Sequence, residues 1–154
     1  MSHIQVSQLI QAPKHRVFQQ IVDIACLPQQ LSEHIEVDSL DFDEPLQIGS
    51  EIRCVMSRWH FSQCCRLRIE ELLADDRLTY KQVEGLFKSW IHTIELKQHG
   101  SGDQTVVTDL VEYEMPFGLL GYLLDDLHVR RDMRCVLQSR LRALKAQCEK
   151  KTVN

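Results

Sequence analysis

SWIHTIELKQHGSGDQTVVTDLVEY, residues 89–113, is the most informative stretch of this chain. Apolar and polar residues alternate on both sides of its centre, which is the period of a β-strand. The central HGSGD, residues 99–103, contains two glycines and is typical of a hairpin connection. The stretch therefore predicts two adjacent antiparallel strands. One face carries Trp90, His92, Ile94 and Leu96 from the first strand and Val107, Asp109, Val111 and Tyr113 from the second.

The chain before this hairpin predicts one strand, two short helices and further strands. Ile4–Ile10 alternates like a strand, and Ala12-Pro13 opens a helix because proline suits the first helical turn. Pro28 either breaks that helix or begins a short second one, Leu27–His34. The period then returns to two, and the further strands lie at Ile35–Phe42, around Ile52–Met56, around Cys65–Ile69 and at Leu78–Val83.

The chain after the hairpin predicts one long helix. The helical period runs from Leu119 almost to the C-terminus, over roughly 40 Å at about 1.5 Å per residue. Its apolar stripe comprises Leu120, Leu124, Leu127, Met133, Leu137, Leu141 and Leu144. Its basic residues, expected on the outer face, are Arg130, Arg131, Arg134, Arg140, Arg142 and Lys145. Such a helix needs a large apolar surface, which the sheet supplies. We predict an α+β fold, with a curved antiparallel sheet around the C-terminal helix and a short helix pair after the first strand.

Length and composition are those of one globular domain. The chain has 154 residues, is 44% hydrophobic and carries a net charge of −4, which argues against a nucleic-acid partner. We expect a domain over residues 1–148 and a polar tail over 149–154. The chain contains no apolar stretch of membrane-spanning length, and we expect no signal peptide. The six cysteines contain no C-x-x-C pair, which favours reduced thiols and a cytoplasmic location.

The ordered elements and several short motifs resemble the START-like SRPBCC superfamily, whose fold is the helix grip. The motifs are Ala12-Pro13, Val22-Asp23, FKSWIH at residues 87–92, DLVEY at residues 109–113 and PFG at residues 116–118. The combination is similar to bacterial ligand-binding proteins of the polyketide cyclase/dehydrase-like type. The resemblance implies that residues 1–148 form a START-like domain with a hydrophobic cavity between sheet and helix. It also implies a small lipid-like, aromatic or polyketide-like ligand and no cofactor.

His92 and Asp109 form the sharpest candidate site. They lie on the two strands of the hairpin, near opposite each other, and can share a face. An imidazole N–H is a suitable partner for a buried carboxylate. In a functional interpretation, the pair is a polar anchor or a general acid and base in the cavity. In the alternative interpretation, it is a structural pair across the two strands or lies on the convex side of the sheet. The sequence leaves open which strand face lines the cavity.

Further candidates would line the cavity or its mouth. Trp90 and Tyr113 either stack on a flat ligand or pack in the core. Arg58 lies at a strand end or hairpin tip and either binds an acidic headgroup or is solvated. The remaining ligand-binding candidates are Tyr80 and, at the junction of the last strand with the long helix, Met115, Phe117, Leu120 and Leu124.

Three function hypotheses follow. The first is a binding protein without catalysis for a small hydrophobic molecule, since we find no compelling catalytic set, no metal-ligand spacing and no nucleophile elbow. The second is a cyclase or dehydratase in which His92 and Asp109 move protons on a polyketide-like substrate. The third is an interaction module that meets a protein partner through the basic helix face and the sheet edge. The protein is expected to be a monomer or a homodimer.

Overall fold

A computed structural model describes residues 1–58, 60–116 and 126–150. It contains seven strands, two short helices, a 3-10 helix and one long helix within these residues. The elements in chain order are β1 (Ser2–Ile10), α1 (Lys14–Val22), η1 (Ile24–Cys26), α2 (Leu27–Leu31), β2 (Glu36–Phe42), β3 (Glu51–Arg58), β4 (Phe61–Leu73), β5 (Arg77–Glu84), β6 (Ser89–His99), β7 (Gln104–Glu114) and α4 (Asp126–Glu149).

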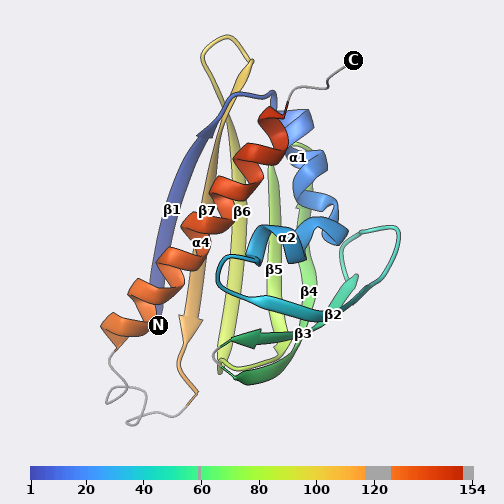
Figure 1. Cartoon of the computed structure of the whole chain (residues 1–154). Coiled ribbons are helices and arrows are strands. Elements are labelled where there is room, and N and C mark those ends of the chain that lie inside the picture. Colours follow the sequence, from blue (N-terminus) through green and yellow to red (C-terminus); the bar gives the residue numbers. More distant parts are fainter. Residues whose placement is uncertain (59, 117–125, 151–154) are drawn as a thin grey trace.

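All seven strands form one antiparallel sheet in the order β1-β7-β6-β5-β4-β3-β2. The strands follow one another along the chain except that β1 pairs with β7. The sheet is curved, and the helices lie on one side of it (Figure 1). This is the predicted α+β helix-grip architecture, with a short helix pair after the first strand and a long helix at the C-terminus.

The β6–β7 hairpin forms where the sequence predicts it. His99 pairs with Gln104, and the turn between them contains Gly100 and Gly102 at φ of 65° and 101°. Positive φ is the conformation in which glycine has no steric cost, which explains the two glycines. Asp109 faces Ile94 in the ladder, so His92 is its diagonal neighbour on the same face and not its direct partner.

The core lies between the concave face of the sheet and the helices. The stripe of α4 is confirmed at its buried positions Met133, Leu137, Leu141 and Leu144. The prediction for Leu127 is wrong, since this side chain is 62% exposed. The helix crosses the sheet obliquely and its first turn projects past β1 at the sheet edge (Figure 1). Leu120 and Leu124 lie outside the described residues.

Within the described residues, no helix combines the length and the apolar character that crossing a membrane requires.

Candidate functional site

A buried polar cluster joins the sheet to α4. Asp109 of β7 has no exposed surface, and Arg140 of α4 donates a hydrogen bond from Nη1 to its Oδ2 over 2.8 Å. His92 of β6 lies beside the same carboxylate, with Nε2 3.4 Å from Oδ1. The shared face of His92 and Asp109 is therefore the concave face, toward α4.

Arg140 is a second residue of α4 that sequence reasoning placed wrongly. We predicted it on the outer face of the helix, yet its side chain is only 5% exposed. It lies seven residues after Met133 and four before Leu144, a spacing that places it on the apolar stripe. The signal was thus present in the sequence, where an arginine on a buried stripe calls for a buried carboxylate partner.

The electrostatics of the cluster keep Asp109 ionised. Burial removes water from the carboxyl group and acts to raise its pKa, but the positive charge of Arg140 and the contact with His92 outweigh this effect. The pKa of Asp109 is therefore held below its ordinary value. The carboxylate and the guanidinium form a pair without net charge in the protein interior.

Two atoms at the centre of this cluster are not satisfied. The 3.4 Å separation of His92 Nε2 and Asp109 Oδ1 is longer than an ordinary hydrogen bond. Both atoms are buried and without a hydrogen-bond partner among the described residues. Leaving such a group unpaired costs about 1–3 kcal/mol, so the cluster carries unused hydrogen-bonding capacity.

Tyr80 of β5 extends the cluster on the other side of His92. It faces His92 directly in the β5–β6 ladder, and the two ring centroids are 6.0 Å apart. Burial raises the pKa of Tyr80 to about 12; Arg140 opposes the rise and Asp109 adds to it. The hydroxyl therefore stays protonated at neutral pH and is an available donor.

Aromatic side chains lie next to the polar cluster. Trp90 packs edge-on to His92, with ring centroids 6.3 Å apart. Phe87 contacts both Trp90 and Tyr113, with centroids 5.1 and 5.5 Å apart. Tyr113 has no exposed surface, so Trp90 and Phe87 are the more accessible members of this group. Phe87 was not a predicted candidate, although it belongs to the FKSWIH motif at residues 87–92.

Side chains on the concave face of the sheet differ in how deeply they are buried. Ile52, Ile69 and Ile94 are fully buried. Farther along the same face of the same strands, Met56, Leu67 and Trp90 are only partly buried. Ile52 and Leu67 are direct partners in the β3–β4 ladder, so the boundary between fully and partly buried positions runs obliquely across β3, β4 and β6. We call the partly buried positions Met56, Leu67 and Trp90, together with Phe87, which contacts Trp90, the inner hollow.

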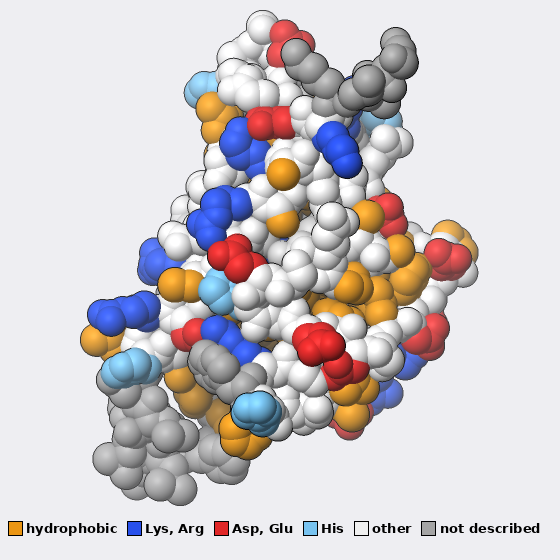
Figure 2. Space-filling view, in the orientation of Figure 1, with side chains coloured by type: hydrophobic (Ala, Val, Ile, Leu, Met, Phe, Trp, Pro, Cys, Tyr) orange, Lys and Arg blue, Asp and Glu red, His pale blue; other side chains and the backbone are white. Residues whose placement is uncertain are grey.

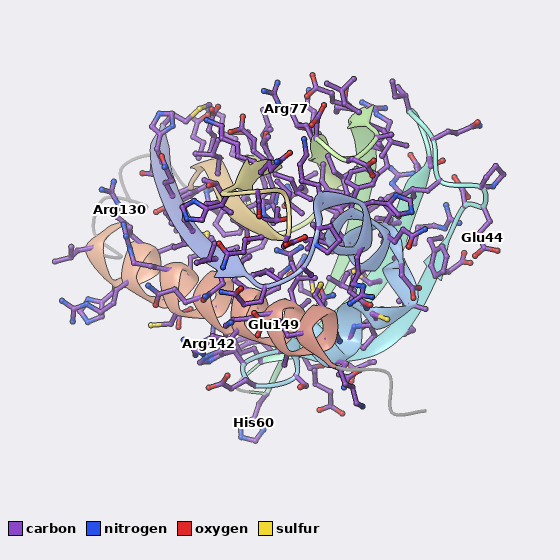
Figure 3. The ribbon with its side chains drawn as sticks, turned by 90° about the horizontal axis from the view of Figure 1, so that it is seen from above. Glu44, His60, Arg77, Arg130, Arg142 and Glu149 are labelled. Carbon is purple, nitrogen blue, oxygen red and sulfur yellow. The ribbon has the colours of Figure 1, made fainter. Side chains whose placement is uncertain are left out.

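Arg58 bridges β3 and α4 near the inner hollow. Its Nη1 and Nη2 donate to the two carboxylate oxygens of Asp132, each over 2.5 Å. The predicted hairpin tip is confirmed, because β3 ends at Arg58 and β4 begins at Phe61. An acidic ligand that used Arg58 would have to displace Asp132. Figure 3 shows His60, at the tip of this hairpin, on the α4 side of the sheet.

The other predicted ligand-binding residues follow β7 in the sequence. Met115 is partly buried and packs against the core. Phe117, Leu120 and Leu124 lie outside the described residues, so their predicted role at the end of the cavity is untested.

The family model described as "Polyketide cyclase / dehydrase and lipid transport" matches residues 10–130. The chain belongs to this family. No curated protein matches it.

Solved structures share the fold of this family member over nearly its whole length. The protein TTHA0849 from Thermus thermophilus is 22% identical with a TM-score of 0.81, over 99% of this chain and all of that one. A START superfamily protein from Mycobacterium smegmatis is 13% identical with a TM-score of 0.77, over 96% and 97% of the two chains. The di-domain ARO/CYC protein StfQ from the steffimycin biosynthetic pathway is 16% identical with a TM-score of 0.75, over 96% of this chain and half of that one. At these identities the likeness shows the fold alone.

This family member also has a surface pocket of about 520 Å³ away from the polar cluster. It lies between the end of α1 and the β2–β3 loop, and is lined by Val22, Ile24, Phe42, Asp43, Glu44, Pro45 and Leu46. Figure 2 shows hydrophobic side chains gathered in this region with acidic ones at their edge. None of Met56, Leu67 and Trp90 lines this pocket, so it is separate from the inner hollow.

Proposed function

We propose that this protein binds a small apolar molecule, lipid-like or aromatic, in the inner hollow between the sheet and the first half of α4. The observation that carries the proposal is the uncovered part of the concave wall. Met56, Leu67 and Trp90 face inward yet keep exposed surface. Covering a few hundred Å² of apolar surface at roughly 25 cal/mol per Å² favours binding by several kcal/mol before association costs.

The polar cluster is proposed to orient the ligand at the floor of the hollow. His92 and the protonated hydroxyl of Tyr80 are the candidates for polar contact. Asp109 and Arg140 neutralise each other over 2.8 Å, so the floor carries no net charge when His92 is neutral. A mostly apolar concave wall with a few polar groups is the usual form of a small-molecule site. The family description, which includes lipid transport, supports this proposal.

Equilibrium binding of 1-anilinonaphthalene-8-sulfonate, followed by fluorescence, tests the proposal. Leu67→Trp would fill the hollow, and we expect it to weaken binding at least about tenfold. Leu73→Trp is the matched control, because Leu73 lies on the same strand and is 50% exposed. We expect it to bind like the unmodified protein. The proposal fails if the unmodified protein binds no probe, or if both tryptophan variants bind equally well.

An enzyme of the cyclase or dehydratase type is the second candidate. The observation that favours it is a buried imidazole 3.4 Å from a carboxylate. The low pKa of Asp109 makes the carboxylate a weak proton acceptor at neutral pH, which favours an orienting role over proton transfer. A synthetic poly-β-ketone supplied to the protein tests the candidate. Cyclised product that is lost in His92→Gln but kept in His99→Gln would support it, and equal rates with and without protein would exclude it.

We further propose that the protein works in a reducing compartment such as the cytoplasm. The six cysteines are free thiols in the structure, which supports this location.

A further inference from the structure

Two cysteines face each other across neighbouring strands. Cys54 of β3 and Cys65 of β4 are direct partners in the antiparallel ladder. Directly opposed residues in such a ladder have Cα atoms about 4.5–5.5 Å apart. This is within the range of about 4.4–6.8 Å that a disulfide spans. The backbone therefore already holds the two residues at bonding distance, without a change of register.

Both side chains belong to the concave face. Cys54 follows Ile52 at an interval of two and Cys65 precedes Leu67 at the same interval, so each continues the inward-facing row of its strand. Cys54 is 5% exposed, whereas Cys65 is partly exposed. Both cysteines line a pocket of about 410 Å³ at the surface, and Cys65 is the more exposed of the two thiols there.

The two thiols also interact with each other. A hydrogen bond between them lowers the pKa of Cys54, and the same contact together with burial raises the pKa of Cys65. Cys54 is therefore the more easily ionised thiol of the two. A thiolate is the nucleophile in thiol–disulfide exchange.

We propose that Cys54 and Cys65 form a reversible disulfide that makes the wall of the inner hollow responsive to redox state. The oxidant is a small disulfide such as oxidised glutathione. A thiolate of the pair attacks it, forms a mixed disulfide and releases one glutathione, which takes up a proton. The second thiol loses its proton and displaces the other glutathione. Two cysteine thiols are oxidised to one disulfide, and one glutathione disulfide is reduced to two thiols.

The bond would crosslink β3 to β4 in the wall that contains Met56 and Leu67. The disulfide would lie on the same hairpin as Arg58. It would therefore link the two strands of the hairpin that contacts Asp132. Reversible disulfides in reducing compartments are typically sensing or catalytic and not structural. The inference does not depend on which ligand the hollow holds.

Thiol mapping tests the inference. The full chain is equilibrated with excess oxidised glutathione under native conditions, quenched with acid, alkylated and digested, and the peptides are assigned by mass spectrometry. We expect a peptide pair joined through Cys54 and Cys65 that has lost two hydrogen atoms and is restored by dithiothreitol. Cys64→Ser is the matched control, because Cys64 is exposed and precedes Cys65 on the same strand. It should form the same disulfide.

Cys54→Ser and Cys65→Ser should each abolish the crosslink and leave the partner thiol free or singly glutathionylated. Mapping of the unmodified protein decides the question even if a serine variant fails to fold. The inference is overturned if Cys54 and Cys65 remain alkylatable at every glutathione ratio, or if the only disulfides found involve Cys64 or Cys135.

Discussion

Arg140 and Asp109 are buried residues of opposite charge, and each needs the other as its partner. Their side chains are 5% and 0% exposed, so neither charge has water to stabilise it. Removing one member leaves the other charged in the protein interior, which costs about 3–5 kcal/mol. We therefore expect Arg140→Met to lower the free energy of unfolding by about that amount, measured by urea denaturation.

A control lies on the same helix. Arg142 is 58% exposed and lies 3.7 Å from Glu33, so Arg142→Met should change stability by less than about 1 kcal/mol. The double variant Asp109→Leu/Arg140→Met replaces both charges with apolar groups and should recover most of the loss. Equal effects of the two arginine substitutions would contradict this account of the buried pair.

Tyr80 gives a prediction at alkaline pH. Its pKa of about 12 in the folded protein lies above the value of about 10 expected in the unfolded chain. The folded state thus holds the phenolic proton more tightly. The resulting stability is fully present below about pH 10 and is lost as pH rises through the folded-state pKa. Absorbance titration of phenolate should show a late step whose amplitude is smaller in Tyr80→Phe, and an unchanged late amplitude in the variant would refute the assignment.

The polar cluster could be predicted only in part from the sequence. Alternation along the two hairpin strands correctly placed His92 and Asp109 on one face, because the side-chain period of a strand is two. The diagonal offset could not be read, since it depends on how many residues the turn leaves unpaired. Arg140 was missed because its charge was given more weight than its position on the helical period.

The β3–β4 hairpin and α4 are joined by the bidentate contact of Arg58 with Asp132. These side chains are 21% and 37% exposed, so solvent screens the pair in part. We expect a double-mutant cycle with Arg58→Ala and Asp132→Ala to give a coupling energy of about 1 kcal/mol. Loss of the bridge should also speed release of a bound probe, because the hairpin and the helix flank the inner hollow.

Arg66 and Glu84 provide the comparison for that cycle. They lie on β4 and β5, are 41% and 65% exposed, and their closest charged atoms are 3.8 Å apart. Their coupling energy should be close to zero, and their replacement should leave probe release unchanged. A coupling between Arg58 and Asp132 no larger than this one would mean that the bridge does not hold the hairpin to the helix.

The elements themselves were largely predictable. Local periodicity and turn residues predict strands and helices without knowledge of the fold, and all seven strands lie where the alternation predicts them. Leu127 shows the limit of this reasoning. Its position in the helical repeat predicts burial, but burial also requires a packing partner opposite the side chain. The helix crosses the sheet obliquely, so its first turn lies beyond the sheet edge (Figure 1).

The molecule as a whole should lose stability in acid through its carboxylates. The folded-state pKa of Asp109 is below its ordinary value, so its contribution is present above the unfolded-state pKa of about 3.9. It is lost as pH falls through the folded-state value. Asp43, Glu114 and Glu149 also have lowered pKa values, but their partnerships lie at the surface.

High salt distinguishes the contribution of the buried pair to stability in acid from the contributions of surface pairs. At about 1 M ionic strength the screening length is only about 3 Å, so exposed pairs lose most of their effect while the buried pair of Asp109 and Arg140 keeps its own. Urea denaturation between neutral pH and about pH 2 in high salt should therefore still show a decline in unfolding free energy below about pH 4. The Asp109→Leu/Arg140→Met variant should be flatter over the same range, because its folded state no longer holds a buried carboxylate that acid must protonate. If the two proteins decline in parallel at high salt, the acid sensitivity arises at the surface and the buried pair does not control it.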